Sequence, residues 1–284
     1  MGKLDTKSAR DFLNAYRSSK TAMLGLAIMI CSCAITITPT VVSPYNPYDM
    51  SALAFLPPGR QHPFGTDNLG RDVLSRVIWG TRVSLAFGFV VAGMSLMLGV
   101  ILGAIPGYFG GLIDDVFSRF FEVYLMIPSL FLIILVTAIF GTNIMFTMAI
   151  VGLTMWPSNA RITRAQVLTL KDRAFVQAAK CTGAGHLRII FTHILPNGIY
   201  PVIVNSTLQM GSAILTEASL SFLGLGDVNH VSWGQIIFTA QNYFATAWWM
   251  AVFPGIAILA LVLAFNLIGD GINLAMNPRL SKRT

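Results

Sequence analysis

The sequence predicts an all-α membrane protein with six transmembrane helices and both termini in the cytoplasm. Hydrophobic residues make up 55% of the chain and charged residues only 11%, and the mean hydropathy is +0.68. This composition is that of an integral membrane protein rather than a water-soluble domain. A span requires about 20 apolar residues. Six stretches meet that requirement: 23–42, 84–106, 118–140, 143–160, 198–220 and 247–269.

The basic residues orient these spans. With a cytoplasmic N-terminus, fifteen of the nineteen basic residues lie inside: Lys3, Lys7, Arg10, Arg17, Lys20, Arg119, Arg161, Arg164, Lys171, Arg173, Lys180, Arg188, Arg279, Lys282 and Arg283. The outside keeps Arg60, Arg71, Arg76 and Arg82. The positive-inside rule favours this orientation. The net charge of +7 therefore reflects topology. It does not indicate nucleic-acid binding, which would require a basic face with exposed aromatic residues on a soluble domain.

The first span follows a basic cytoplasmic segment, 1–22, and is predicted to stay in the protein as an anchor. Its apolar run is longer than that of a signal peptide, and no A-x-A site follows it. Between this span and the second, segment 43–83 is rich in Pro and Gly and predicts a folded outside loop. The end of this loop is either an interfacial helix or a simple lead into the second span.

Two further features concern packing and loops. In the second span, Gly99, Gly103 and Gly107 recur every four residues and predict close approach by another helix. The outside loop 221–246 contains an apolar piece near Ile236, but polar residues interrupt it, so we do not expect it to span the membrane.

The chain lacks the residues that would power transport on its own. No G-x-x-x-x-G-K-[ST] phosphate-binding loop is present, and no set of residues suggests a hydrolytic site or a metal site. The acidic candidates for a proton relay are Glu217 and Asp270, and we expect both to reach interface water from the ends of their spans in capping or structural roles. Energy must then come from a partner, and no cofactor is expected in this chain.

A cytoplasmic loop between the fourth and fifth spans, 161–197, carries the strongest motif. Within it, AFVQAAKCTGAGHLRIIFTHILPN predicts a short helix, a break at Gly183 and Gly185, and a second helix that ends at Pro196. Small and basic residues alternate on this segment. It could be an ordinary connection or a surface that fits a groove on a soluble protein.

The loop resembles the EAA loop of binding-protein-dependent ABC importer permeases. In that family a Glu-Ala-Ala triplet is followed by a Gly and, later, by an Ile-x-Leu-Pro ending. The positions that match here are Gln177, Ala178, Ala179, Gly183, His193, Leu195 and Pro196. Gln177 replaces the usual Glu and His193 the usual Ile, although H-I-L-P-N is typical of the peptide and nickel branch.

Other segments extend the resemblance to the C-type subunit of dipeptide, oligopeptide and nickel importers. They are HPFGTDNLGRDVLSRVIWGTRVSL, GYFGG, EASLSFLGLG, SWG and AFNLIGDGINLAMNPRL. The resemblance implies an importer transmembrane domain over 84–272 after a first helix and loop at 23–83, with a cytoplasmic tail at 273–284.

The same resemblance implies the partners and the location. They are a second, related permease, two cytoplasmic ATPases that bind ATP and Mg, and an extracytoplasmic binding protein that delivers peptides. The complex would lie in a prokaryotic inner membrane, and the seven loop residues would couple the permease to the ATPases. No residue is assigned to substrate. A secondary carrier or channel without ATPases, or a purely structural scaffold, is the alternative.

Overall fold

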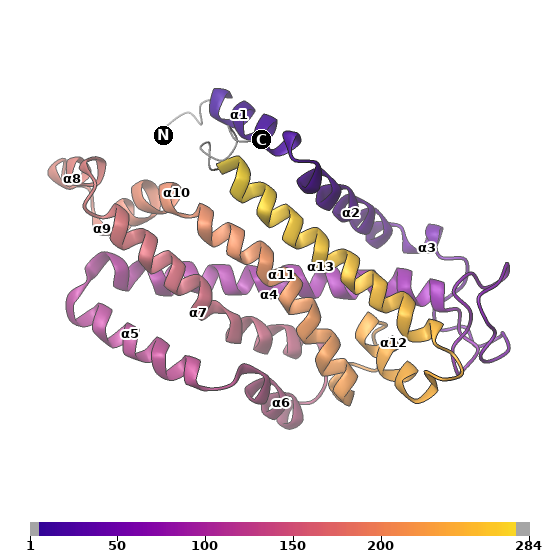
Figure 1. Cartoon of the computed structure of the whole chain (residues 1–284). Coiled ribbons are helices and arrows are strands. Elements are labelled where there is room, and N and C mark those ends of the chain that lie inside the picture. The colour runs from indigo at the N-terminus through magenta and orange to yellow at the C-terminus, as the bar shows by residue number, and fades with distance from the viewer. Residues whose placement is uncertain (1–5, 277–284) are drawn as a thin grey trace.

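The computed structural model describes residues 6–276, and the longest helices run roughly side by side (Figure 1). Predictions for Lys3, Arg279, Lys282 and Arg283, and for most of the tail 273–284, fall outside the described residues. The longest helices are α2 (Lys20–Ile37), α4 (Val73–Phe109), α7 (Ile144–Leu170), α11 (Tyr200–Leu220) and α13 (Trp249–Met276). The shorter helices are α1 (Thr6–Ser18), α3 (Pro39–Val42), α5 (Gly111–Met126), α6 (Ser129–Phe140), α8 (Ala174–Cys181), α9 (His186–Arg188), α10 (Leu195–Gly198) and α12 (Trp233–Ala240).

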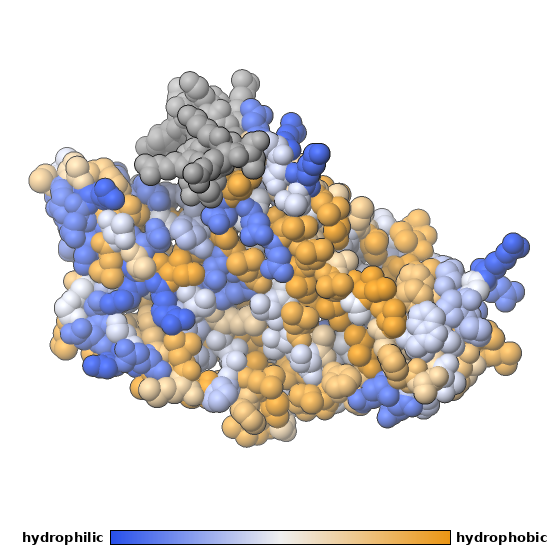
Figure 2. All heavy atoms as spheres, in the orientation of Figure 1, coloured by the Kyte–Doolittle hydropathy of each residue, from blue (hydrophilic) through white to orange (hydrophobic). Residues whose placement is uncertain are grey.

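The helices have the character of membrane spans. Three of them, α2, α4 and α13, are long and apolar enough to cross a bilayer, and two bent pairs raise the number to five if each pair is one span. Figure 2 shows an apolar belt across the middle of one face, with polar residues gathered at the α8 end and at the opposite end. The all-α membrane class is confirmed. The predicted fourth span lies within α7, and the count of six remains a prediction.

Helix α4 settles one question that the sequence left open. The Asp72 side chain caps it by accepting a hydrogen bond from the Ser75 N–H at 2.7 Å, and the helix then runs without interruption to Phe109. The residues before the second predicted span are therefore a lead into that span and not a separate interfacial helix.

The segment before α4 is a folded loop, as predicted. The Asp67 carboxylate accepts hydrogen bonds from the Leu69 and Arg71 N–H groups, each at 2.9 Å, and from the Arg71 Nε at 2.6 Å. Asp72 lies 2.9 Å from the His62 Nδ1 atom. These contacts tie the Pro- and Gly-rich chain to the first turn of α4.

The predicted glycine stripe packs α4 against α7. A Cβ at Gly99 would collide with Asn159, and one at Gly103 would collide with the Ala160 carbonyl. At Gly107 the nearest atom is the Arg164 carbonyl, at 3.0 Å from the position of a Cβ. Because these glycines have no side chains, the two backbones approach closely and make direct van der Waals contact. Such contact stabilises helix pairs in lipid, where the hydrophobic effect does not drive helices together.

The third predicted span is broken, which sequence reasoning missed. Helix α5 ends at Met126, α6 begins at Ser129, and the two are bent by 75°. Pro128 has no N–H to continue α5, and it restricts Ile127 to an extended conformation, with φ −80° and ψ 118°. The proline thus explains the position of the break.

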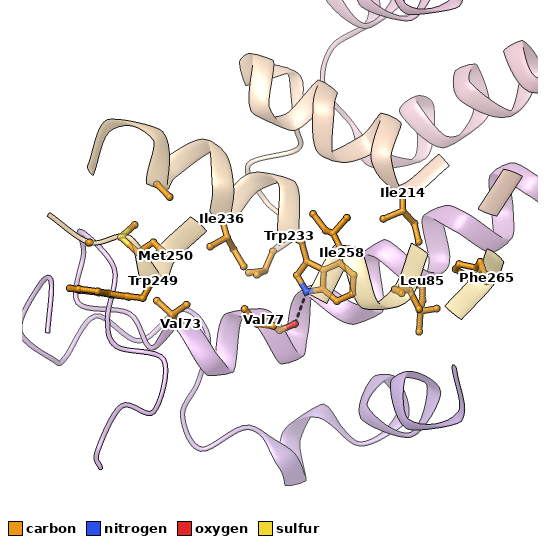
Figure 3. Packing of buried hydrophobic residues seen from close by; sticks show 14 of the residues in the cluster. Val73, Val77, Leu85, Ile214, Trp233, Ile236, Trp249, Met250, Ile258 and Phe265 are labelled. Carbon is orange, nitrogen blue, oxygen red and sulfur yellow. Dashed lines mark hydrogen bonds between the residues drawn. The ribbon is translucent and has the colours of Figure 1, made fainter. Parts of the chain in front are cut away.

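A buried hydrophobic core that includes Trp233 and Trp249 joins α4, α11, α12 and α13 (Figure 3). The Trp233 indole N–H donates to the Val77 carbonyl at 2.9 Å, and the Trp249 indole N–H donates to the Thr66 carbonyl at 3.0 Å. Ile236 belongs to the same core on α12, a helix of eight residues that is too short to span. The expectation that segment 221–246 forms a loop without a span is confirmed.

Loop 221–231 reaches the start of α7 through Asp227. Its carboxylate accepts a hydrogen bond from the Ile144 N–H at 3.1 Å, where the helix needs an acceptor. Burial alone would raise the pKa of Asp227, but the N–H groups of Asn229 and Ile144 and the His230 side chain hold it below its usual value.

The expectation that Glu217 reaches interface water is wrong, whereas its contacts agree with the expected structural role. Only 3% of this residue is exposed, and its Oε1 atom accepts a hydrogen bond from the Ser221 hydroxyl at 2.8 Å. Ser221 follows α11 as the first residue of a π-helical turn, 221–225. Asp270 is exposed on α13, as expected.

Replacement of Gly103 by Leu tests the α4–α7 contact. The new side chain would collide with the Ala160 backbone, and overpacking of this kind costs about 1–3 kcal/mol. Gly93→Leu is the matched control on the same helix, because no atom lies within 4 Å of its Cβ position. We expect a lower thermal unfolding temperature in detergent for Gly103→Leu only. Equal unfolding temperatures for the two variants would contradict the packing.

Candidate functional site

Helix α8 presents two different faces. Val176 and Ala179 are buried, and their spacing of three residues places them on one side of the helix. Gln177 and Ala178 are exposed on the other side. The Gln177-Ala178-Ala179 triplet of the motif is therefore divided. Ala179 faces the protein, and Gln177 and Ala178 face outward.

Gly183 ends α8 in a Schellman motif. Its φ is +77°, a conformation that favours glycine, and its N–H donates to the Lys180 carbonyl at 3.0 Å. The Ala184 N–H donates to the Ala179 carbonyl at 3.1 Å. No atom lies within 4 Å of a Cβ built on Gly183, so this residue shapes the turn and leaves open space beside it.

The loop is fixed to the ends of α4 and α7 by an apolar cluster. Members from the loop pack against Ala104 and Tyr108 of α4 and Val167 of α7. The loop members are Val176, Ala179, Ile189, Ile190, Ile194 and Leu195. Displacement of α8 would therefore act on both long helices.

Tyr108 makes the most specific link between α4 and the loop. Its hydroxyl lies 3.1 Å from the His186 Nδ1 atom, within hydrogen-bond distance. The Lys180 ammonium group lies 5.9 Å from the centre of the Tyr108 ring, and Phe109 packs against His186 with ring centres 5.6 Å apart. The GYFGG segment and the loop thus meet through these side chains.

A second link joins the start of α5 to α7 nearby. The Arg164 guanidinium makes a bidentate ion pair with the Asp114 carboxylate, and the Nη2–Oδ2 distance is 2.7 Å. Bidentate hydrogen bonds between charged groups are stronger than those between neutral groups, and they fix the relative orientation of the two side chains. They hold α5 against α7 immediately after the turn at Gly110 and Gly111.

The expectation that the second loop helix stops at Pro196 is wrong. Residues 189–194 form a π-helix, and the helix continues through α10 to Gly198. The Leu195 N–H bonds to the Ile190 carbonyl, five residues back. This wider turn makes room for the proline ring. The chain then bends by 65° into α11.

The structure divides the predicted motif between exposed and buried positions. Gln177, Ala178, Gly183 and Pro196 are exposed, His193 is half-buried, and Ala179 and Leu195 are buried. Sequence reasoning missed the exposed apolar side chains of Phe175 and Leu187, with 42% and 68% exposure, which flank the turn. The sequence feature that could have revealed them is an apolar residue on the otherwise polar face of a short helix.

The loop is exposed and packs against the ends of two long helices. Comparison with known proteins identifies the family of the chain. Residues 95–282 match the family model for the binding-protein-dependent transport system inner membrane component. The chain belongs to this family. It is therefore a multi-pass permease of the bacterial inner membrane.

Several curated relatives of this permease are similar over nearly their whole length. The dipeptide transport system permease protein DppC of Alkalihalophilus pseudofirmus is 37% identical over 95% of this chain and 90% of the relative. DppC of Haemophilus influenzae is 36% identical over 96% and 95%. The oligopeptide transport system permease protein OppC of Bacillus subtilis is 36% identical over 96% and 90%.

A solved structure shares the fold of the permease. It is an inward-facing MetNI methionine ABC transporter, at a TM-score of 0.53 and 21% identity, with 74% of this chain and 95% of the other covered.

The two sides of α8 predict different effects of an added charge. Ala179→Glu would bury a carboxylate in the apolar cluster and loosen the loop, whereas Ala178→Glu would leave the loop folded. We expect several-fold faster tryptic cleavage after Lys180 for Ala179→Glu, because local opening controls proteolysis. The purified permease serves for the measurement. Equal cleavage rates in the two variants would refute the assignment of the faces.

Proposed function

We propose that this chain is one permease subunit of an ATP-driven importer of dipeptides or oligopeptides. The names of the relatives, and their similarity over at least 90% of their length, support the substrate class. The chain would form the translocation path with a second, related permease. An extracytoplasmic binding protein would deliver the peptide.

The proposal includes six spans with both termini in the cytoplasm. The spans are α2, α4, the bent pair α5–α6, α7, α11 and α13. The distribution of basic residues supports this orientation. The loop with α8 then lies in the cytoplasm, and the folded loop before α4 and helix α12 lie outside.

The exposed surface around Gly183 is the observation that carries the coupling function. We assign Gln177, Ala178 and Gly183, with Phe175 and Leu187 beside them, to the contact with a cytoplasmic ATPase. We assign His193, Leu195, Pro196 and Ala179 to the support of that surface; Ala179 and Leu195 are buried in the apolar cluster. ATP and Mg would be bound by the ATPases.

The contacts of the loop support a route for mechanical coupling. A shift of α8 as the ATPases close would press on the apolar cluster and on Tyr108. Both belong partly to α4, and Val167 carries the same displacement to α7. The permease would then alternate between inward-facing and outward-facing arrangements.

Substitution of Gly183 tests this coupling. Gly183→Asp would place a charge in the open space beside the turn, where we expect the ATPase to bind. Gly183→Asn is the matched control, because Asn has the same shape, carries no charge and tolerates positive φ. We expect peptide uptake and ATPase co-purification to fall with Asp and to persist with Asn.

The assay is affinity purification of the tagged permease from its native membrane in mild detergent, with subunits identified by mass spectrometry. Recovery of a second permease and ATPases supports the proposal. A permease that purifies without any ATPase, yet transports, would favour an independent carrier. Undiminished uptake by Gly183→Asp would reject the coupling surface.

A further inference from the structure

A hollow of about 390 Å³ lies near the end of α4 that follows the outside loop. Four segments build it: the loop before α4, α4 itself, the start of α7 and loop 221–231. Its lining combines the polar and aromatic side chains of Tyr48, Trp79, Arg82 and His230 with the apolar side chains of Val83, Ala86, Ile144 and Met148. A hollow with this mixed lining suits an amphipathic ligand.

Arg82 brings an unpaired positive charge to this hollow. Arg71 and Arg76, which precede it in the chain, lie 2.6 Å and 3.6 Å from the Asp67 carboxylate. Arg82 is exposed, and it forms no ion pair with any residue between 6 and 276. A guanidinium group with free N–H groups can bind a phosphate through two parallel hydrogen bonds.

The acidic residue of loop 221–231 is already occupied. Both carboxylate oxygens of Asp227 accept hydrogen bonds, Oδ1 from the Asn229 N–H at 2.9 Å and Oδ2 from the Ile144 N–H at 3.1 Å. The His230 Nδ1 atom lies 3.0 Å from the same Oδ2 atom. Asp227 is therefore satisfied by its own neighbours, and Arg82 is left for an anion from outside the chain.

The hollow lies at the level of the lipid headgroups. Arg82 precedes the apolar span 84–106 by two residues, or about 3 Å at about 1.5 Å per residue. Trp79 and Tyr48 share the lining of the hollow with it, and Tyr48 is 53% exposed. Trp and Tyr are enriched at this boundary of a membrane, because each has an apolar ring and one polar N–H or O–H group.

An apolar stripe of α4 continues from Arg82 into the membrane. Ala86, Val90, Met97 and Ile101 follow Arg82 at steps of four and seven residues, which places all five on one face of the helix. All of them are exposed, and Met97 reaches 67%. The stripe below Arg82 contains no polar side chain, so it suits an acyl chain and not a hydrated solute.

The geometry points to a binding site for one anionic phospholipid of the outer leaflet. The Arg82 guanidinium would pair with the lipid phosphate, Trp79 and Tyr48 would contact the glycerol region, and an acyl chain would lie along the stripe that begins at Ala86. One lipid would then connect α4, the start of α7 and loop 221–231. This site goes beyond the proposed transport function and takes only its leaflet from the proposed orientation.

Two other ligands fit the hollow less well. A free phosphate ion would bind Arg82 but leave the apolar lining in contact with water. A zwitterionic phospholipid such as phosphatidylethanolamine would bring an ammonium group close to Arg82, and like charges repel. The occupied carboxylate of Asp227 offers that ammonium group no free acceptor.

Native mass spectrometry of the assembled transporter tests the site. The complex is delipidated in mild detergent and incubated with equal amounts of dioleoylphosphatidylglycerol and dioleoylphosphatidylethanolamine. Arg82→Gln is compared with Arg60→Gln, a matched control at an exposed outside arginine that does not line the hollow. We expect Arg82→Gln to retain at least about tenfold less phosphatidylglycerol, because a hydrogen bond between charged groups is lost. Arg60→Gln should retain as much as the unaltered transporter.

A second variant separates the hollow from charge alone. Ala86→Trp would fill the hollow and keep Arg82, so we expect it also to retain about tenfold less phosphatidylglycerol. This variant decides the matter if Arg82→Gln does not insert. Phosphatidylglycerol should also raise the unfolding temperature of the unaltered transporter and of Arg60→Gln but not of Arg82→Gln, because a ligand that binds only the folded state stabilises it.

Equal retention of phosphatidylglycerol by Arg82→Gln and Arg60→Gln would overturn the proposal. Equal retention of the two lipids by the unaltered transporter would overturn the anionic class. Displacement of phosphatidylglycerol by excess inorganic phosphate would assign the hollow to a small anion instead of a lipid.

The outcome is distinguishable from that of the proposed transport function. If no ATPase co-purifies with the unaltered permease, the transport function fails, and the same lipid measurement is made on the permease alone. If the ATPases are recovered but Arg82→Gln retains the lipid, the lipid site is wrong and the importer stands.

Discussion

The close approach of α4 and α7 is the constraint on which the rest of the structure depends. Gly99 and Gly103 let the two backbones touch where lipid offers no hydrophobic drive. The same contact places Asn159 within 3.0 Å of Ser95 on α4 and 3.1 Å of Ser206 on α11. A buried polar network thereby joins three helices. Each member has a partner, which is the condition under which such networks stabilise a single arrangement.

Departures from regular helix occur where the chain changes direction within the membrane domain. Pro128 breaks one span, and the π-helical turn 189–194 allows Pro196 to stay within a helix that then bends into α11. A second π-helical turn, 221–225, begins with Ser221, which donates a hydrogen bond to Glu217. In a bilayer each departure must find substitute hydrogen bonds. The turn at 189–194 is packed through Ile189, Ile190 and Ile194, whereas the break at Pro128 is exposed in the single chain.

Much of the fold could be predicted from the sequence, because span length and glycine spacing are local properties. The helix break at Gly183 could be predicted from the glycines in the loop, and the structure adds the Schellman geometry. The burial of Glu217 could not be predicted, because it depends on how the following turn packs. The contact of Tyr108 with His186 also escaped prediction, since residues 78 positions apart in sequence meet only after α4, α7 and the loop have packed.

Helix α4 has one further consequence for movement. It runs for 37 residues, or about 56 Å at about 1.5 Å per residue, so it extends well beyond both surfaces of a hydrocarbon core. Tyr108 at one end touches the loop, and Val77 at the other end accepts the Trp233 hydrogen bond. Under the proposed coupling, the helix would act as a lever: a tilt of about 5° around its middle would move each end by about 2 Å in opposite directions. A push at the loop would then also displace Trp233 at the other end of the helix.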